Sequence, residues 1–208
     1  MRDGLIRLVL WLVSRGLFKL HIIGEENVPA RGPALLASNH VTYVDGLLIW
    51  FYVPCPIRFI VWKPFFEVVG VRWVLRLIAA IPVADGGPRN MRETIQRARG
   101  ALAKGNVVCI FPEGSITRSG ELHRFKRGME AIAQGLDVPI IPVHLDGLWG
   151  SVFSFEGGKA FWKWPKRWQH PATISFGSPM PAGSSADAVR QAVEQLASEA
   201  GERRVPAL

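Results

Sequence analysis

Residues 90–112 read NMRETIQRARGALAKGNVVCIFP, a polar stretch with a helical repeat followed at once by a short apolar one. Asn90 with Glu93 three positions later has the pattern of a capping box, which predicts a helix over residues 90–104. A Gly-Asn pair would end this helix, and the β-branched run at residues 107–111 predicts a strand. Helices that alternate with strands in this way indicate a parallel α/β sheet.

The same alternation continues on both sides of this stretch. Further strands are predicted at residues 34–38, 138–143 and 172–176, and further helices at residues 129–134 and 184–200, the last capped by Ser184 and Asp187. Residues 150–170 are aromatic, glycine-rich and irregular. We find no internal repeat and no linker long enough to divide the chain. The predicted fold class is therefore α/β, with a mostly parallel central sheet flanked by helices in one domain over residues 21–208.

The composition is basic and rich in tryptophan. The 208 residues include 25 Lys and Arg against 17 Asp and Glu, eight Trp beside two Tyr, and two Cys. These counts exclude a disordered acidic chain, a disulfide-stapled module and a repeat fibre. Lys and Arg minus Asp and Glu give +3, +3 and +4 for residues 1–20, 56–76 and 159–170, and each of these windows contains tryptophan. This combination favours a membrane surface over a solvated basic face.

Residues 1–20 are predicted to form an amphipathic helix at a membrane surface. The uninterrupted apolar run, residues 8–13, is too short for a bilayer, which needs roughly 20 apolar residues. On a helical projection the polar side chains gather on one side: Arg7, Ser14, Arg15 and Lys19. A second apolar stretch at residues 68–83 contains two arginines and is interpreted as interfacial or core rather than membrane-spanning.

The segment NHVTYVDG, residues 39–46, follows the strand predicted at residues 34–38 and places His40 five positions before Asp45. The carboxylate of Asp45 can fold back onto one ring nitrogen of His40, which leaves the other nitrogen as a general base. The alternative is a structural histidine that caps a turn. Taken alone the spacing favours the structural role, because it arises often by chance.

A second segment, FPEGS at residues 111–115, follows the strand predicted at residues 107–111, and Arg118 lies three residues further on. A strand that ends in a glycine turn exposes backbone N–H groups, and an arginine adds a bidentate phosphate donor. Together with VPIIPV at residues 138–143, these blocks resemble the glycerolipid acyltransferase family, whose type member is 1-acylglycerol-3-phosphate acyltransferase. The resemblance covers roughly residues 20–180. Within this family, the sequence of these blocks most resembles the acyltransferase portion of bifunctional acyl-carrier-protein synthetase/2-acylglycerophosphoethanolamine acyltransferases.

The resemblance implies a role for each of these residues. His40 would be the catalytic base that takes the proton of the acceptor hydroxyl, and Asp45 would orient it. The family's second block commonly ends with an arginine that residues 80–86 lack, so that Lys63 or Arg89 would take its place. The substrate-binding residues that the resemblance implies are Glu113, Gly114, Ser115, Arg118, Lys63 and Arg89.

The implied activity is that of a lysophospholipid O-acyltransferase. A fatty acyl group would move from acyl-ACP or acyl-CoA to the free hydroxyl of a 1-acylglycerol-3-phosphate-type or 2-acylglycerophosphoethanolamine-type acceptor. We expect no metal and no other cofactor, because a thioester is activated enough for direct attack. Two alternatives stay open: a non-catalytic lipid-binding membrane protein, and a lysophospholipase that uses the same His40–Asp45 pair on water.

The expected partners are the lysophospholipid, the acyl thioester and a membrane surface, with no nucleic acid. Acyl carrier protein is acidic, and it could dock on an arginine-rich face formed by Arg89, Arg92, Arg97 and Arg99. The expected location is the cytoplasmic face of the inner cell membrane, as a peripheral or monotopic protein.

Overall fold

A sheet of seven strands organises the computed structural model, which describes residues 2–53, 55–85, 87–161, 164 and 169–202. The strands in this part of the chain are β1 (Phe18–Ile23), β2 (Ala34–Ser38), β3 (Ile57–Trp62), β4 (Ile81–Val83), β5 (Val107–Ile110), β6 (Ile140–Asp146) and β7 (His170–Phe176). The α-helices are α1 (Arg2–Leu17), α2 (Asp45–Tyr52), α3 (Val71–Leu77), α4 (Pro88–Ala103), α5 (Gly128–Ala133) and α6 (Ala186–Glu202). Short 3-10 helices are η1 (Glu25–Asn27), η2 (Lys63–Glu67) and η3 (Glu156–Gly158).

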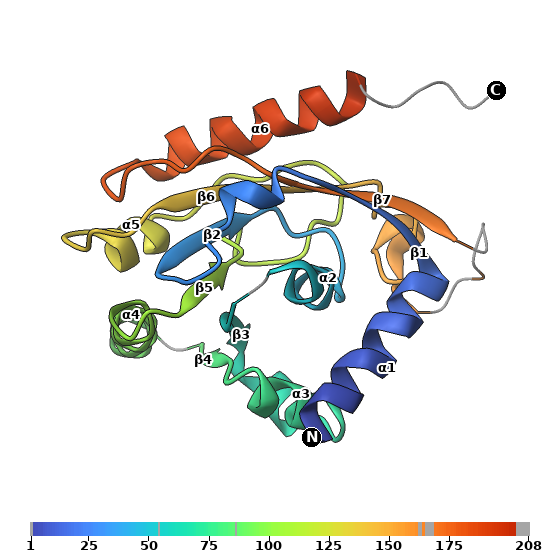
Figure 1. Ribbon diagram of the computed structural model, residues 1–208, viewed down its shortest axis with the longest axis horizontal. Helices are drawn as coiled ribbons and strands as arrows, with labels where there is room; N and C mark the ends of the chain where they lie inside the picture. Colours follow the sequence, from blue (N-terminus) through green and yellow to red (C-terminus); the bar gives the residue numbers. More distant parts are fainter. Residues whose placement is uncertain (1, 54, 86, 162–163, 165–168, 203–208) are drawn as a thin grey trace.

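The strands lie in the order β1-β7-β6-β2-β5-β3-β4. Neighbouring strands are parallel at every position except between β6 and β7, which pair antiparallel. The prediction of a mostly parallel α/β sheet is therefore confirmed. Figure 1 shows how β1, from the start of the chain, lies beside β7, from near its end.

Alternate residues of the central strand β2 pack into two separate cores. Leu36 faces α2 and packs with Leu48, whereas Leu35 faces α4, α5 and α6 and joins Leu102 and Val189. Figure 1 shows α6 and α2 on opposite sides of the sheet. Each such side chain, when fully buried, contributes about 1.5–3 kcal/mol. Both faces of β2 are covered, which is why its sequence is continuously apolar rather than alternating.

The capping box predicted at the start of α4 is wrong. The helix begins two residues earlier, at Pro88, because proline suits the first helical position, where no N–H is needed. The Asn90 side chain donates to the carbonyl of Asp85 at 2.7 Å, and Glu93 pairs with Arg97 instead. The predicted cap of α6 is likewise displaced by one residue, because Ser185 Oγ accepts the N–H of Ala188 at 3.1 Å.

The amphipathic helix predicted over residues 1–20 corresponds to α1, which ends at Leu17. Phe18 is buried and begins β1, which pairs with β7. The last three residues of the predicted helix therefore belong to the sheet. Among the described residues, none of the helices combines the length and apolar character that crossing a bilayer requires.

The stretch at residues 68–83, interpreted from sequence as one interfacial or core segment, is divided in the structure. It forms the short helix α3 and then, after a turn, the edge strand β4. Sequence reasoning also missed α2 and the strand β3 that follows it along the chain. Residues of α2, β3 and α3 line the same cavity as His40.

Candidate active site

The imidazole of His40 lies against the carboxylate of Asp45 just beyond the end of β2. His40 Nδ1 and Asp45 Oδ2 are 2.9 Å apart, and the ring of His40 stacks on Phe111 with 4.0 Å between ring centroids. The His40 side chain is 20% exposed, whereas Asp45 is fully buried. With Nδ1 engaged by the carboxylate, Nε2 is the ring nitrogen left to exchange a proton with a bound molecule.

The loop between β2 and α2 wraps around the Asp45 carboxylate. Oδ2 accepts the backbone N–H groups of Val41 at 2.6 Å and Thr42 at 2.9 Å, and Oδ1 accepts the Thr42 hydroxyl. Asp45 is also the first residue of α2, where the helix dipole favours negative charge. Every surrounding group donates to this side chain, so the position requires an acceptor with two oxygens.

The register of the parallel strands β2 and β5 brings Glu113 to His40. Ala37 pairs with Ile110, and His40 and Glu113 each lie three residues beyond this pair. Glu113 Oε1 accepts the backbone N–H of His40 at 2.7 Å, and Oε2 accepts that of His123 at 3.0 Å. Glu113 therefore holds the histidine loop and the loop after β5 together, through backbone groups.

The Glu113 carboxyl is only 5% exposed. Burial raises its pKa above the ordinary value, because removal from water disfavours the charged form. The two backbone N–H groups act in the opposite direction and offset part of this effect.

Replacing Glu113 with glutamine is expected to lower the free energy of unfolding by about 1–3 kcal/mol at low pH, because the hydroxyl oxygen of a protonated carboxyl can still accept a backbone N–H whereas an amide nitrogen cannot. The wild-type advantage should also shrink as the pH rises. A carboxyl with a raised folded-state pKa binds its proton more tightly when folded, so its stabilising contribution is lost as pH rises through that pKa. Urea unfolding of both proteins across a pH series measures the difference. A difference that grows with pH would contradict this account.

Asn39 is a structural member of the site that sequence reasoning missed. Its side chain donates to the carbonyl of Leu145 at 3.0 Å and accepts the N–H of Leu145 at 2.7 Å, which ties the end of β2 to β6. Its position in the sequence could have indicated this role, because a buried polar residue that directly follows a buried strand must form hydrogen bonds.

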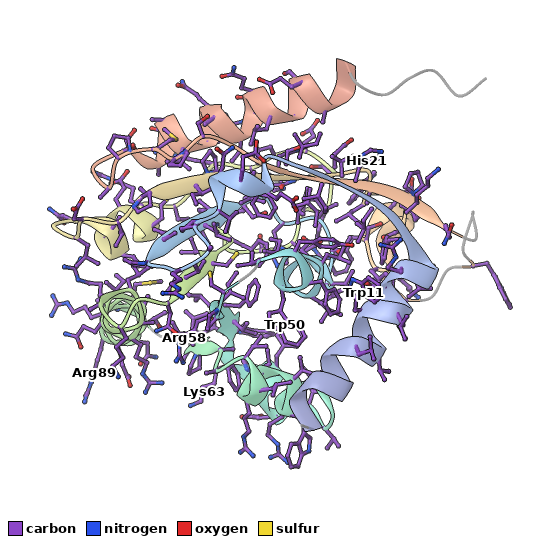
Figure 2. All side chains as sticks on the ribbon, viewed as in Figure 1. Trp11, His21, Trp50, Arg58, Lys63 and Arg89 are labelled. Atoms are coloured by element: carbon purple, nitrogen blue, oxygen red, sulfur yellow. The ribbon has the colours of Figure 1, made fainter. Side chains whose placement is uncertain are left out.

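A cavity of about 1290 Å³ opens beside His40. Ligand cavities commonly measure about 300–1,000 Å³, so this one is larger than a typical site for one small ligand. Its polar lining includes His40, Ser115, Arg118, His123 and Lys126. Its apolar lining comes from α2, β3, α3 and α4 and includes Trp50, Phe59, Leu75, Ile78, Met91 and Ile95. Figure 2 shows Trp50 between α2 and α3, where it contributes to this apolar part.

The structure brings some of the predicted substrate-binding residues together and leaves two outside. Gly114, Ser115 and Arg118 line the cavity, and the Arg118 guanidinium lies 4.3 Å from the centroid of the Phe155 ring. Glu113 is buried behind this lining. Lys63, in η2, and Arg89, exposed on α4, do not line the cavity (Figure 2).

The arginine-rich face proposed from sequence is smaller in the structure. Arg99 Nη1 donates to the carbonyls of Ala131, Ile132 and Gln134 at 3.2, 3.1 and 2.6 Å, so Arg99 holds the end of α5. Arg97 pairs with Glu93. Arg89 and Arg92 stay exposed.

Among the described residues there is no cluster of three or more His, Cys, Asp or Glu side chains placed to hold a metal ion. Half of the basic window at residues 159–170 lies outside the described residues, namely Trp162, Lys163, Pro165, Lys166, Arg167 and Trp168.

The sequence profile of the Acyltransferase family matches residues 19–146, more than half of the chain. The match includes the loops that carry His40, Asp45 and Glu113. The chain belongs to this acyltransferase family, as the sequence resemblance indicated.

Several curated relatives are 1-acyl-sn-glycerol-3-phosphate acyltransferases. The chloroplastic enzyme of Arabidopsis thaliana is 29% identical over 131 residues, which is 62% of this chain and 36% of that protein. The Borreliella burgdorferi enzyme is 27% identical over 145 residues, 70% of this chain and 57% of that protein. The chain thus matches well under two thirds of the length of these relatives. The crystal structure of the 1-acyl-sn-glycerophosphate acyltransferase of Thermotoga maritima has the same fold, with a TM-score of 0.71, 23% identity, and coverage of 100% of this chain and 85% of that one.

Proposed function

We propose that this protein is a lysophospholipid O-acyltransferase that transfers a fatty acyl group from a thioester to the free hydroxyl of a 1-acylglycerol-3-phosphate-type acceptor. The observation that carries the proposal is the His40–Asp45 pair at the polar end of a large, mostly apolar cavity. Family membership and the names of the relatives support the reaction class and the acceptor class.

In the proposed reaction, His40 Nε2 takes the proton of the acceptor hydroxyl as its oxygen attacks the thioester carbonyl. The new C–O bond forms, the C–S bond breaks, and the departing thiolate receives the proton from His40. Asp45 holds the Nδ1–H and stabilises the imidazolium between these two steps, as the third group does in a Ser-His-Asp triad. The chain itself needs to form no covalent intermediate.

The cavity lining suggests how the substrates lie. The acyl chains would occupy the apolar part between α2, β3 and α3, and the acceptor phosphate would occupy the polar end beside Arg118. Arg118 and His40 line the same cavity, so a lysophospholipid whose phosphate lies near Arg118 would have its free hydroxyl in the cavity that His40 lines.

The proposed donor is an acyl group on acyl carrier protein or coenzyme A. One side of α4 lines the cavity through Met91 and Ile95, while Arg89 and Arg92 on the same helix are exposed. An acidic carrier protein bound to these two arginines would sit next to the cavity. This charge complementarity supports acyl carrier protein as a partner.

The test is a transfer assay with labelled acyl-ACP or acyl-CoA against lysophosphatidate, 2-acylglycerophosphoethanolamine and water. We expect ester formation on lysophosphatidate above the other acceptor. Free fatty acid without acylated acceptor would support a lysophospholipase instead. Lipid binding with neither product would support a non-catalytic lipid-binding protein and would contradict the proposal.

We further propose that the protein works on the cytoplasmic face of the inner membrane, as a peripheral or monotopic protein. Helices α1 and α3 carry the observations that support this proposal. Both helices expose apolar side chains, including Leu12 and Val13 of α1, 55% and 50% exposed, and Trp73 of α3, 64% exposed; Val69, just before α3, is 84% exposed. Exposed apolar patches of this kind are typical of lipid or partner contacts.

The double substitution Val69→Ser with Trp73→Ser is expected to weaken binding to phosphatidylglycerol-containing vesicles by about tenfold or more, because each apolar side chain leaves the lipid interface. Co-sedimentation with vesicles measures the binding. Transfer between short-chain substrates in solution serves as the control and should be nearly unchanged. Unaltered co-sedimentation would contradict a membrane contact at α3.

A further inference from the structure

Lys126 extends over the backbone of Gly114 at the polar end of the cavity. Gly114 has φ +75°, and a Cβ atom built there would meet Lys126 Nζ at 2.3 Å. The absence of a side chain at Gly114 therefore makes room for the ammonium group. Both residues line the same cavity as His40.

The main chain fixes where Lys126 begins. Its N–H donates to the carbonyl of Pro112 at 2.9 Å, and the preceding Phe125 is 1% exposed in the core. The loop after β5 thus folds back on itself, so that a residue twelve positions beyond Gly114 returns to it. This folding, rather than nearness in sequence, puts the lysine beside Gly114, in the lining of the cavity that His40 also lines.

The ammonium of Lys126 has no carboxylate partner within the described ranges. The buried carboxylate in this region, Glu113, uses its two oxygens on the N–H groups of His40 and His123. Lys126 therefore adds positive charge to the cavity, in addition to Arg118. Two cations in the lining of a cavity that also contains a histidine suit an anionic substrate group.

We propose that Lys126 binds the phosphate of the acceptor lipid, and that it supplies the cation that residues 80–86 lack. Of the candidates weighed from sequence, neither Lys63 nor Arg89 reaches the cavity lining, whereas Lys126 does. A lysine ammonium offers three donors from one compact charge, which suits a phosphate that approaches along one side of the cavity. The inference rests on the proposed function, because it names a ligand for the acceptor of that reaction.

The first test is the variant Lys126→Gln. We expect the KM for lysophosphatidate to rise about tenfold or more, because a charge-assisted contact is lost, while the KM for the acyl thioester stays near its wild-type value. The variant Lys126→Arg should recover part of the loss. The matched control is Arg127→Gln, which removes the next cation along the chain, one that is 85% exposed and pairs with Glu130. An unchanged acceptor KM in Lys126→Gln overturns the inference and leaves the proposed function standing.

The second test uses the contact with Gly114. Gly114→Ala should raise the acceptor KM in the wild-type background, because the new Cβ displaces the ammonium. In a Lys126→Ala background the same change should add little to the acceptor KM, although the strain of a positive φ affects stability in both. Fully additive effects on KM would contradict a shared role.

A third measurement does not depend on activity. Acetylation of the Lys126 amine by acetic anhydride, followed by mass spectrometry, reports whether a ligand covers it. Lysophosphatidate below its micelle concentration should protect Lys126, whereas monoacylglycerol, which lacks the phosphate, should not, and inorganic phosphate shows whether the anion alone suffices. Equal labelling with and without lysophosphatidate overturns the inference. Protection in a protein that transfers no acyl group would reject the proposed function and keep the phosphate site.

Discussion

Replacing His40 with alanine is expected to lower kcat for acyl transfer by about 10²–10⁴-fold, the contribution typical of general base catalysis. The reason is geometric, because the ring of His40 lines the cavity with Nδ1 held by Asp45 and Nε2 left for the substrate. Initial rates at saturating acceptor and donor measure the effect. The acceptor KM should change much less, since the alanine variant keeps Arg118 and Lys126, the proposed phosphate ligands.

Two further variants separate chemistry from structure in this prediction. His40→Asn keeps a donor that can reach Asp45 but provides no base, so it should be as inactive as His40→Ala while its unfolding midpoint stays near the wild-type value. His21→Asn makes the same exchange on β1, in an exposed histidine away from the cavity (Figure 2), and should keep full activity. Substantial transfer by His40→Asn would rule out His40 as the base.

Replacing Asp45 with asparagine is expected to reduce kcat by a similar factor, of the order of 10²–10⁴. Asparagine offers one acceptor oxygen where the native carboxylate accepts from His40, Val41 and Thr42. Its amide nitrogen would face a donor, and the imidazole would lose the partner that fixes its tautomer. We also expect the free energy of unfolding to fall by about 1–3 kcal/mol for the unmatched buried donor.

Asp45→Asn should lose both kcat and unfolding free energy, whereas His40→Asn should lose only kcat. Thr42→Val is the graded control, because it removes the hydroxyl donor to Asp45 and leaves the contact with His40 in place. Its activity should fall far less than that of Asp45→Asn. Rates paired with urea unfolding curves measure both quantities. Normal activity in Asp45→Asn would mean that His40 needs no carboxylate partner.

The part of the site that the sequence predicts best is the part formed by near neighbours. His40 and Asp45 are five residues apart, so a single loop can join them whatever the rest of the fold does. The same applies to elements with a strong local sequence pattern, such as α4 and β2, which lie close to their predicted ranges.

Other features depend on contacts between distant parts of the chain, which the local sequence pattern indicates only weakly. The start of α4 was misplaced because Asn90 and Glu93 found other partners than each other. Lys126 was overlooked as a cavity residue because only the fold of the loop after β5 returns it to Gly114. Arg99 was assigned to the surface, but three carbonyls at the end of α5 bind it. Sequence spacing alone does not predict such tertiary contacts.

The hydrogen bond between the His40 N–H and Glu113 has a consequence for how the protein acquires activity. It joins residues 73 positions apart, whereas the His40–Asp45 contact spans only five. Long-range contacts of parallel strands form late, because a large loop must close before they give any stabilisation. The His40–Asp45 pair can therefore assemble early in folding, while its alignment with the cavity requires β2 and β5 to pair. Regain of enzymatic turnover after dilution from denaturant would then follow the slow, topology-limited step and not the fast local one.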